Sequence, residues 1–267
     1  MVSRPEAWGA QHAARFQEQS VVDRYHLRPP YPPEVFTLLN DLLVDEPRVV
    51  LDAGCGLGDI ARYLLDRVER IDAVDISQPM LNRARTLPGG DSPKIRWLHG
   101  RIEDIELRPP YALITAGRSL HWMDWQIVLP RFAQLLTGRG MLAIIGSSEE
   151  GEPWREEVDA LAESYSVAPQ FWGTDLIALL EEQQLFRTIG NYKTSPMEQL
   201  QTITDFIAAL HSRSGLSLEA LGAERSARLD AEVRQLLAPY EQNGQIVVLA
   251  VGHVTWGRPL AGKASAR

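Results

Sequence analysis

The sequence Leu51-Asp-Ala-Gly-Cys-Gly-Leu-Gly58 decides the fold of this chain. It directly follows the short apolar run Val49–Leu51 and precedes the segment Ile60–Val68, whose apolar residues recur with helical spacing. Glycines at such a turn let the backbone bend sharply and approach a ligand closely, because a Cβ atom there would collide with it. The stretch therefore predicts the first strand, turn and helix of an α/β sheet that binds a ligand at this turn.

The glycine spacing discriminates among the ligands that such turns bind. A dinucleotide fingerprint would need a third glycine at position 59, but that residue is Asp59, whose carboxylate at a helix start would repel a pyrophosphate. A phosphate-binding Walker loop is excluded because no Gly-Lys-Ser/Thr follows. Gly-x-Gly-x-Gly suits S-adenosylmethionine, which carries a cationic sulfonium and ammonium and has no phosphate. We therefore expect S-adenosylmethionine as the cofactor, S-adenosylhomocysteine as its product, and no metal.

Acidic residues at the ends of two strands fit the same ligand. Asp52 ends the first strand, where its carboxylate is expected to hold the cationic methionyl end, directly or through water. Asp75 ends the next strand, nineteen positions after Gly56, where a carboxylate accepts both hydroxyls of a ribose. Ile76 and Met80 then offer apolar surface to one face of an adenine. The alternative for Asp75 is a solvent-exposed helix cap.

Short apolar strands alternate with helical segments as far as residue 146. Strands that are nearly all apolar indicate a parallel sheet buried on both faces. We predict an α/β fold with a doubly wound, mostly parallel, seven-stranded sheet. The first five predicted strands are Val49–Leu51, Ile71–Val74, Ile95–Leu98, Tyr111–Thr115 and Met141–Ile145. The predicted helices among them are Glu34–Leu43, Ile60–Val68, Pro79–Thr86 and Trp125–Leu136.

The chain after residue 146 is mostly helical in pattern. The last two strands are predicted at Phe186–Thr194 and Gln245–Trp256, and the helices between them are expected to form a lid over the carboxyl edge of the sheet. The predicted helices are Glu152–Ser166, Asp175–Gln183, Met197–Arg213 and Ala220–Tyr240. The predicted division is a helical cap over the cofactor (1–44), a cofactor-binding core (45–146), the lid with the last two strands (147–260) and a flexible tail (261–267).

Composition narrows the class of protein. The formal net charge of −8 and the absence of any Lys/Arg run disfavour a dedicated nucleic-acid binder. The single cysteine, Cys55, excludes an intramolecular disulfide. The first residues lack the apolar core of a signal peptide, and no apolar stretch is long enough to span a bilayer. We expect a cytoplasmic protein, monomeric or weakly homodimeric, with a small-molecule substrate and no nucleic-acid or membrane partner.

These motifs together resemble the class I S-adenosylmethionine-dependent methyltransferases, in particular the small-molecule group called methyltransferase type 11. The resemblance covers about Val21–Ile145 and, more loosely, Ile246–Pro259. Leu51–Asp59 matches the first motif of the family nearly residue for residue, and Ala73–Ser77 matches the second. Leu120–Trp122 reads Leu-His-Trp, as in the family's relatives of trans-aconitate methyltransferase. The resemblance implies methyl transfer to an oxygen, nitrogen or carbon of a small molecule.

The resemblance also implies roles for residues near the cofactor. The Ile102 amide and the Glu103 carboxylate would read the adenine edge, with a turn-capping role for Glu103 as the alternative. Tyr25 would touch the methionyl end and Arg28 its carboxylate, or both would pack an N-terminal helix on the sheet. The predicted cofactor residues are Tyr25, Arg28, Asp52, Ala53, Gly54, Gly56, Asp75, Ile76, Met80, Ile102, Glu103 and Ala116.

The segment Ile114–Trp122 resembles the family's wall of the methyl-transfer site. His121 follows that wall and titrates near neutral pH, so it is the candidate general base, with substrate binding or a backbone hydrogen bond as alternatives. Large aromatic side chains supply rigid apolar walls, although each is also an ordinary core residue. The predicted acceptor-binding residues are Tyr31, Trp122 and Trp125, with Trp154 and Trp172 as further candidates.

The sequence departs from the family pattern at two points. The fourth strand opens with Tyr111-Ala112 where the family has Phe-Asp, and Arg101 stands where an acidic residue is frequent.

Three rival functions stay open at this point. They are methylation of RNA or protein, binding of S-adenosylmethionine without methyl transfer, and an NAD-dependent oxidoreductase. The acidic net charge and the lack of an appended RNA-binding module count against the first of these.

Overall fold

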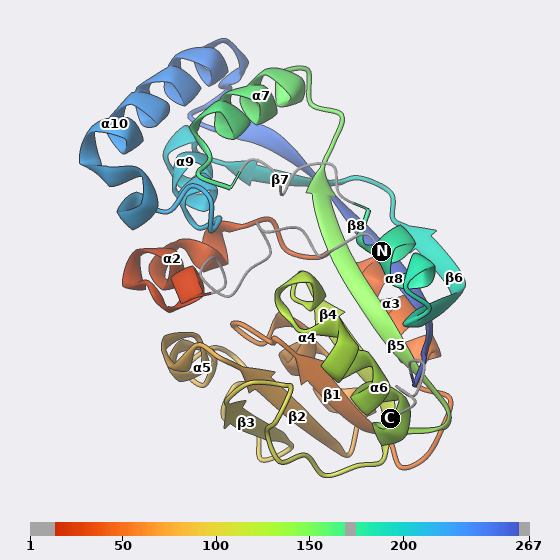
Figure 1. Cartoon of the computed structure of the whole chain (residues 1–267). Coiled ribbons are helices and arrows are strands. Elements are labelled where there is room, and N and C mark those ends of the chain that lie inside the picture. Colours follow the sequence, from red (N-terminus) through yellow and green to blue (C-terminus); the bar gives the residue numbers. More distant parts are fainter. Residues whose placement is uncertain (1–13, 169–174, 262–267) are drawn as a thin grey trace.

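A computed structural model describes residues 14–168 and 175–261 (Figure 1). Within these ranges eight strands form one sheet in the order β3-β2-β1-β4-β5-β8-β6, and β7 pairs with the first part of β8. The pairs from β3 to β5 are parallel, whereas β8 runs antiparallel to its three neighbours. The strands are β1 (Val49–Ala53), β2 (Arg70–Asp75), β3 (Ile95–His99), β4 (Tyr111–Gly117), β5 (Leu136–Glu149), β6 (Phe186–Lys193), β7 (Met197–Gln201) and β8 (Ile246–Pro259). The predicted doubly wound, mostly parallel arrangement of seven strands is confirmed, with β7 as an addition.

The two central strands explain why the site forms where it does. Every residue of β1 is buried, as are the first six residues of β4, because helices cover both faces of the sheet. Asp52 pairs in register with Ala73 of β2 and Thr115 of β4. The parallel strands β1, β2 and β4 therefore end at the same edge of the sheet, where open α/β sheets bind their ligands.

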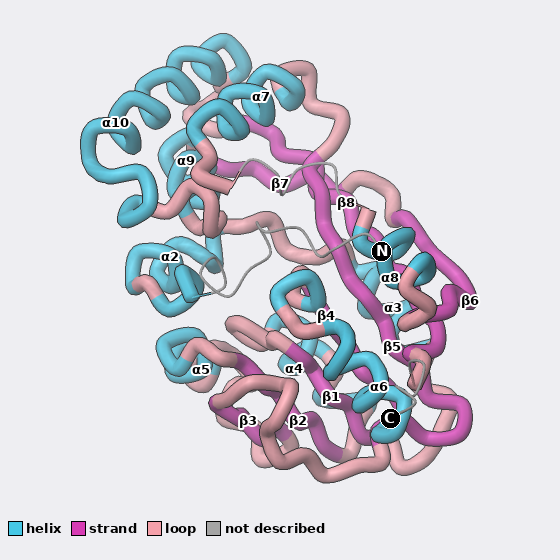
Figure 2. The backbone as a smooth tube through the Cα atoms, in the orientation of Figure 1, coloured by secondary structure: helices cyan, strands magenta, loops and turns pink. Residues whose placement is uncertain are grey.

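Helices pack on both faces of the sheet (Figure 2). One apolar cluster joins β1, β4 and β5 to α6 and α8, and a second joins the same sheet to α3 and α4. A further helix, α5, lies beside β2 and β3. These helices are α3 (Pro33–Asp41), α4 (Asp59–Tyr63), α5 (Gln78–Ala84), α6 (Trp125–Leu135) and α8 (Leu176–Glu182). The helix predicted at Ile60–Val68 is shorter than expected, because α4 ends at Tyr63 and a 3-10 turn, Leu65–Arg67, follows.

Three helices, here called the lid, gather beyond the carboxyl end of β5 (Figure 1). The lid consists of α7 (Arg155–Tyr165), α9 (Ile203–His211) and α10 (Leu218–Leu237), which ends in a 3-10 turn at Ala238–Tyr240. It has an apolar cluster of its own, in which Trp154 packs edge-on against Phe206 with ring centroids 5.3 Å apart. The division of the chain at residues 44, 146 and 260 stays a prediction.

The N-terminal segment connects the lid to the sheet. It contains the 3-10 helix η2 (Ala14–Gln17), helix α2 (Gln19–Arg24) and the 3-10 helix η3 (Tyr25–Leu27). On the lid side, the Arg15 guanidinium donates to the Ser214 carbonyl at 2.8 Å. On the sheet side, the Ser77 hydroxyl donates to the Phe16 carbonyl at 2.8 Å. Helix α2 contacts both α9 and α5 and lies between them in Figure 1.

Two further sequence-based boundaries are wrong. The segment 197–213 is not one helix, because its first five residues form β7 in register with β8, and α9 begins only at Ile203. Strand β5 is longer than Met141–Ile145, because Ser147, Ser148 and Glu149 continue the ladder with β8. The predicted tail beyond residue 261 and the acceptor-site candidate Trp172 lie outside the described residues.

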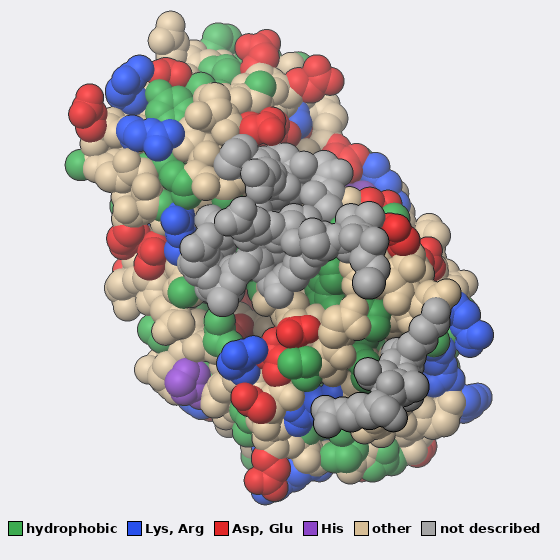
Figure 3. Space-filling model, in the orientation of Figure 1, with side chains coloured by type: hydrophobic (Ala, Val, Ile, Leu, Met, Phe, Trp, Pro, Cys, Tyr) green, Lys and Arg blue, Asp and Glu red, His purple; other side chains and the backbone are tan. Residues whose placement is uncertain are grey.

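The surface carries charges of both signs. On the face shown in Figure 3, Lys and Arg side chains are interspersed with Asp and Glu. Among the described residues, no helix is both long and apolar enough to cross a membrane.

Candidate functional site

The turn at Gly54–Gly58, here called the glycine turn, has the backbone that its glycines allow. Gly54, Gly56 and Gly58 have φ angles of +70°, +52° and +73°, in the left-handed region that other residues rarely adopt. A Cβ atom at Gly54 would lie 2.5 Å from the Cβ of Ser119, and one at Gly58 would lie 2.3 Å from the Trp97 ring. The backbone therefore favours glycine at all three positions, and close neighbours also exclude a side chain at Gly54 and Gly58.

Asp75 holds the glycine turn from the end of β2. One of its carboxylate oxygens accepts from the Gly56 amide at 2.8 Å and the other from the Ser77 amide at 2.7 Å. Burial raises the pKa of Asp75, although these amide hydrogen bonds oppose the shift. Each oxygen keeps a further lone pair, so the carboxylate can still accept from a ligand hydroxyl.

A cavity of about 580 Å³, here called the turn cavity, opens beside the glycine turn and Asp75. Its size falls in the range of ordinary small-molecule sites. The predicted cofactor residues that line it are Tyr25, Gly54, Gly56, Asp75, Ile76, Met80, Ile102 and Glu103. The structure thus brings together eight residues that the sequence assigned to one ligand.

Glu103 lines the turn cavity and also has structural partners. One of its carboxylate oxygens accepts from the Asp124 amide at 3.0 Å, just before α6, and the other lies 3.5 Å from Arg101. Glu103 thus makes structural contacts of the kind that its alternative, turn-capping role requires. A role toward adenine stays a prediction.

Asp52 and Ala53 lie behind the glycine turn and line neither cavity described here. Asp52 is 1% exposed, and one carboxylate oxygen accepts from the Thr115 hydroxyl at 2.9 Å. The other oxygen is buried without a hydrogen-bond partner among the described residues. Burial raises the pKa of Asp52 to about 7. Contact between Asp52 and a cationic ligand stays a prediction.

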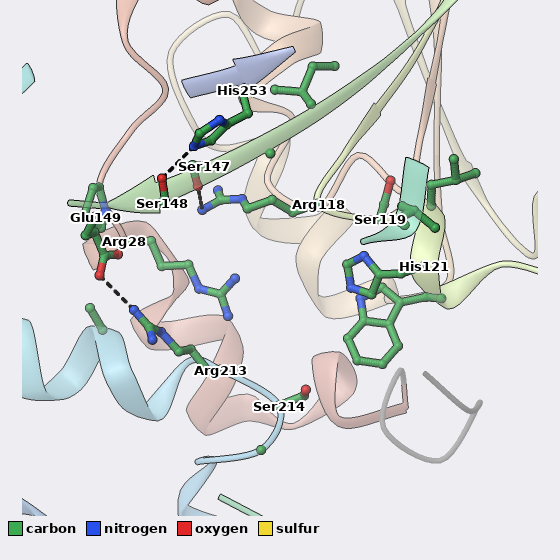
Figure 4. A pocket seen from close by; sticks show the side chains of 18 of the residues that line it. Arg28, Arg118, Ser119, His121, Ser147, Ser148, Glu149, Arg213, Ser214 and His253 are labelled. Carbon is green, nitrogen blue, oxygen red and sulfur yellow. Dashed lines mark hydrogen bonds and ion pairs between the residues drawn. The ribbon is translucent and has the colours of Figure 1, made fainter. Parts of the chain in front are cut away.

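A second cavity of about 500 Å³, here called the lid cavity, lies between the carboxyl ends of β4 and β5 and the lid (Figure 4). Four predicted site residues line it, namely Arg28, Ala116, His121 and Trp122. The His121 ring lies against the Trp122 ring, with centroids 4.5 Å apart. Trp122 also meets Phe16 edge-on at 5.6 Å. Arg28 and Ala116, which the sequence assigned to the cofactor, thus lie on the lid side.

Tyr31 and Trp125 lie outside the lining of both cavities. Tyr31 is buried under the Arg118 guanidinium, whose central carbon is 4.8 Å from the ring centroid. Trp125 begins α6 in the core, and its indole N–H donates to the Leu120 carbonyl at 2.9 Å. Both support the walls of the site from behind, and direct acceptor contact stays a prediction for each.

The two cavities adjoin, and three of the four residues that line both were not predicted individually, although Arg118 and Ser119 lie in the predicted wall segment Ile114–Trp122. The shared residues are Phe16, Arg118, Ser119 and Trp122. Arg118 follows β4 with φ +52°, an uncommon angle for a residue other than glycine. The sequence places Arg118 in the wall segment, but its role depends on β5 and the N-terminal segment, which are distant along the chain. Among the described residues, no cluster of His, Cys, Asp or Glu side chains is arranged to hold a metal ion.

Comparison with known proteins agrees with this geometry. Residues 50–140, from β1 to the turn within β5, match the family described as a methyltransferase domain. This domain, which spans about a third of the chain, belongs to the class I S-adenosylmethionine-dependent methyltransferases. S-adenosylmethionine is the methyl donor of that family.

Among individual proteins, the chain is a distant relative of trans-aconitate 2-methyltransferase from Enterobacter sp. strain 638. The two are 26% identical over 234 residues, which cover 79% of this chain and 86% of that enzyme. An uncharacterized methyltransferase of Mycobacterium tuberculosis is 36% identical over 110 residues, covering 40% of this chain and 55% of its own length. The chain thus matches about half of that relative.

A solved structure shows the same fold. The structure described as a type II methyltransferase from Anaeromyxobacter dehalogenans superposes with a TM-score of 0.63 at 20% identity, covering 86% of this chain and 97% of the other.

Proposed function

We propose that this protein transfers a methyl group from S-adenosylmethionine to a small-molecule acceptor. The observation that carries the proposal is the junction between the two cavities. The turn cavity is bordered by Asp75 and the glycine turn, and the lid cavity lies between the sheet and the lid. The two meet at four shared residues. A donor in the first and an acceptor in the second would face each other at this junction.

The glycine turn and its neighbours fit the donor. Glycines keep the turn free of side chains, and Asp75 offers carboxylate oxygens to the ribose hydroxyls. Ile76 and Met80 supply apolar surface for the adenine, and Tyr25 closes the cavity near Gly56. The bound donor supplies a methyl group on a sulfonium, from which the acceptor takes the methyl carbon while the carbon–sulfur electron pair stays on sulfur.

The contribution of the protein to this reaction is alignment. The walls of the junction, Ser119 and Trp122 among them, would hold acceptor and methyl group in line. Placing reacting atoms about 3–3.5 Å apart supplies on the order of 7–11 kcal/mol of the barrier. This mechanism needs a base only when the acceptor must lose a proton.

His121 is the proposed base for an acceptor that loses a proton. It lines the lid cavity beside Trp122, next to the junction. A well-placed base adds roughly 10²–10⁴-fold to the rate. His121→Gln should therefore lower kcat by that factor, leave S-adenosylhomocysteine binding unchanged and remove the rise of kcat with pH near neutrality. A pH profile of the same shape in the variant would rule out this role.

A small acceptor is favoured over a polymer. The lid cavity has a volume of about 500 Å³, which is that of a small-molecule site. Residues of α9 and of the N-terminal segment line it. The relative trans-aconitate 2-methyltransferase acts, by its name, on a small organic acid. The acidic net charge of −8 also disfavours RNA. We further propose a cytoplasmic protein that is monomeric or weakly dimeric, which gel filtration at several concentrations would test.

The deciding experiment separates small acceptors from polymers. The purified protein is incubated with methyl-labelled S-adenosylmethionine and either the small-molecule or the macromolecular fraction of a cell extract. We expect label in the first fraction, where the mass of the product identifies the acceptor. Label only in RNA or protein would refute the small-molecule proposal, and donor binding without any labelled product would refute methyl transfer.

Asp75→Ala tests the donor site. We expect S-adenosylhomocysteine to bind at least tenfold more weakly, which corresponds to about 1.4 kcal/mol, because the ribose loses its acceptor. Titration calorimetry measures the affinity. The matched control is Asp66→Ala, an exposed carboxylate on the 3-10 turn after α4, which should bind normally. Equal affinity in a folded Asp75→Ala variant would remove Asp75 from the site.

A further inference from the structure

Among the described residues, three arginine side chains and two carboxylates line the lid cavity. Arg28 comes from the end of η3, Arg118 from the end of β4, and Arg213 follows α9 (Figure 4). The carboxylates are Glu149 and Asp159. Which guanidinium groups are already neutralised by these carboxylates decides what the cavity can bind.

Glu149 and Asp159 are committed to other arginines. Glu149 lies 2.8 Å from Arg213 and 2.9 Å from Arg155, and Asp159 lies 3.6 Å from Arg155. Burial alone would raise the pKa of Glu149, but Arg213 and Arg155 outweigh it and hold the pKa below its usual value. Both carboxylates therefore act as partners of Arg155 and Arg213.

Arg28 and Arg118 form no ion pair among the described residues, and the groups that they contact directly are neutral. Glu149 acts on Arg28, and Asp59 acts on Arg118, only at longer range. The Arg28 Nε donates to the Ser212 hydroxyl at 2.7 Å, its terminal nitrogen donates to the Ser212 carbonyl, and its central carbon is 4.3 Å from the Tyr25 ring centroid. Arg118 donates to the Ser147 hydroxyl at 3.2 Å. Its central carbon is 5.8 Å from the same Tyr25 ring. Hydroxyls, a carbonyl and rings hold these guanidinium groups in place without neutralising them.

The two guanidinium charges line the same cavity and repel each other, which is unfavourable unless an anion binds to both. Burial lowers the pKa of Arg28 to about 10, so it still carries its charge at neutral pH. Charged groups removed from water are ordinarily paired. A guanidinium fork matches the oxygens of a carboxylate or phosphate, and such charge-assisted hydrogen bonds are among the stronger ones.

We propose that Arg28 and Arg118 bind an anionic group, a carboxylate or a phosphate, of the methyl acceptor. The proposal rests on the proposed function, since it takes the lid cavity as the acceptor site. Arg118 lines both cavities, so an anion bound to it lies next to the junction with the donor. Arg28 lines only the lid cavity, which assigns it to the acceptor in place of the donor carboxylate.

A binding experiment with defined probes tests this charge preference. The protein is first saturated with S-adenosylhomocysteine and then titrated with glutarate, tricarballylate, glycerol phosphate and the uncharged glutaramide. We expect at least one anion to bind at least tenfold more tightly than glutaramide. A preference for glutarate or tricarballylate over glycerol phosphate identifies a carboxylate, and the reverse order identifies a phosphate. Equal binding of charged and uncharged probes, or none by any probe, overturns the inference.

Arginine variants localise the effect. Arg28→Met and Arg118→Met should each weaken binding of the preferred anion by about 10- to 100-fold. Arg28→Met should leave S-adenosylhomocysteine affinity within threefold of the parent, because Arg28 does not line the turn cavity. The control is Arg234→Met, an exposed arginine on α10 that lines neither cavity and should bind the anion normally.

The variants also separate this inference from the proposed function. Loss of S-adenosylhomocysteine affinity in Arg28→Met, with anion binding retained, would return Arg28 to the donor and overturn its assignment. Arg28→Lys and Arg118→Lys keep the charge and serve where a methionine variant fails to fold. No S-adenosylhomocysteine binding by the parent protein would contradict the proposed function itself, whichever probes bind.

Discussion

Asp52 is a carboxyl group in a place where an isolated charge is costly. It lies at the end of β1, 1% exposed, and one of its oxygens lacks a hydrogen-bond partner among the described residues. Burial raises its pKa from 3.8 to about 7, although the Thr115 hydroxyl opposes the shift. The folded protein therefore holds a proton on Asp52 at a pH where the unfolded chain has lost it.

Asp52→Asn should change how stability depends on pH. Below about pH 4 Asp52 is protonated in both states and has no effect. Between about pH 4 and pH 7 only the unfolded chain ionises, so wild type loses stability relative to Asp52→Asn as the pH rises, by on the order of 4 kcal/mol in total. Above pH 7 the difference should be constant. Urea unfolding of both proteins at several pH values measures it, and parallel curves across this window would contradict the assignment.

Individual residues differ in how far the sequence could predict them. The glycine turn and Asp75 were predictable because their spacing and their position at strand ends follow from the local sequence. Arg118 was not, because its environment is made by Ser147 of β5 and by Tyr25 and Tyr31 of the N-terminal segment. Its backbone angle of φ +52° also has no sequence signal for an arginine. The role of such a residue follows from long-range contacts, which the local sequence does not reveal.

At the scale of elements, β7 shows how tertiary pairing overrides local preference. Met197-Glu-Gln-Leu-Gln201 is composed of good helix formers, which is why the sequence predicts a helix there. The segment instead pairs with β8, from Met197 opposite Ala250 to Gln201 opposite Ile246. One local signal does mark the true start of α9. Thr202 is its N-cap, and Asp205 follows three residues later, which is the pattern of a capped helix.

Thr202→Ala should destabilise the lid through this cap. The Thr202 hydroxyl accepts from the Asp205 amide at 3.0 Å and donates to the Asp205 carboxylate at 2.8 Å. Losing a cap costs about 0.5–2 kcal/mol in free energy of unfolding. Urea denaturation measures the loss, and Thr202→Ser, which retains the hydroxyl, should keep most of the stability. If the serine variant is as unstable as the alanine variant, the hydroxyl is not the cause.

At the scale of the whole molecule, the sheet supplies the donor side and the lid supplies one wall of the acceptor side. The turn cavity depends on β1, β2, β4 and the N-terminal segment. The lid cavity also requires α9 and the chain after it. A change that loosens the lid should therefore affect acceptor binding more than donor binding.

One buried ionic network joins the lid to the sheet. Arg155 at the start of α7 donates to Glu152 at 2.9 and 3.1 Å and to Glu149 of β5 at 2.9 Å. Glu152 also accepts from the Leu249 amide of β8 at 2.7 Å. Glu149 is bound by Arg213 as well, on the lid side of the cavity. Arg155 and Glu152 are 7% and 2% exposed, so water does not screen the pair.

Arg155→Met should cost about 3–5 kcal/mol in free energy of unfolding, because it removes the counter-charge of the buried Glu152 and one of the two counter-charges of Glu149. Chemical denaturation measures the loss. Arg155→Met combined with Glu152→Gln should recover part of it, since the stranded charge is removed while the amide oxygen can still accept from Leu249. Because the network lies outside the turn cavity, S-adenosylhomocysteine affinity of the folded variant should stay within threefold of the parent. A cost below 1 kcal/mol, or no recovery in the double variant, would mean that the lid is held to the sheet by its apolar cluster and not by this network.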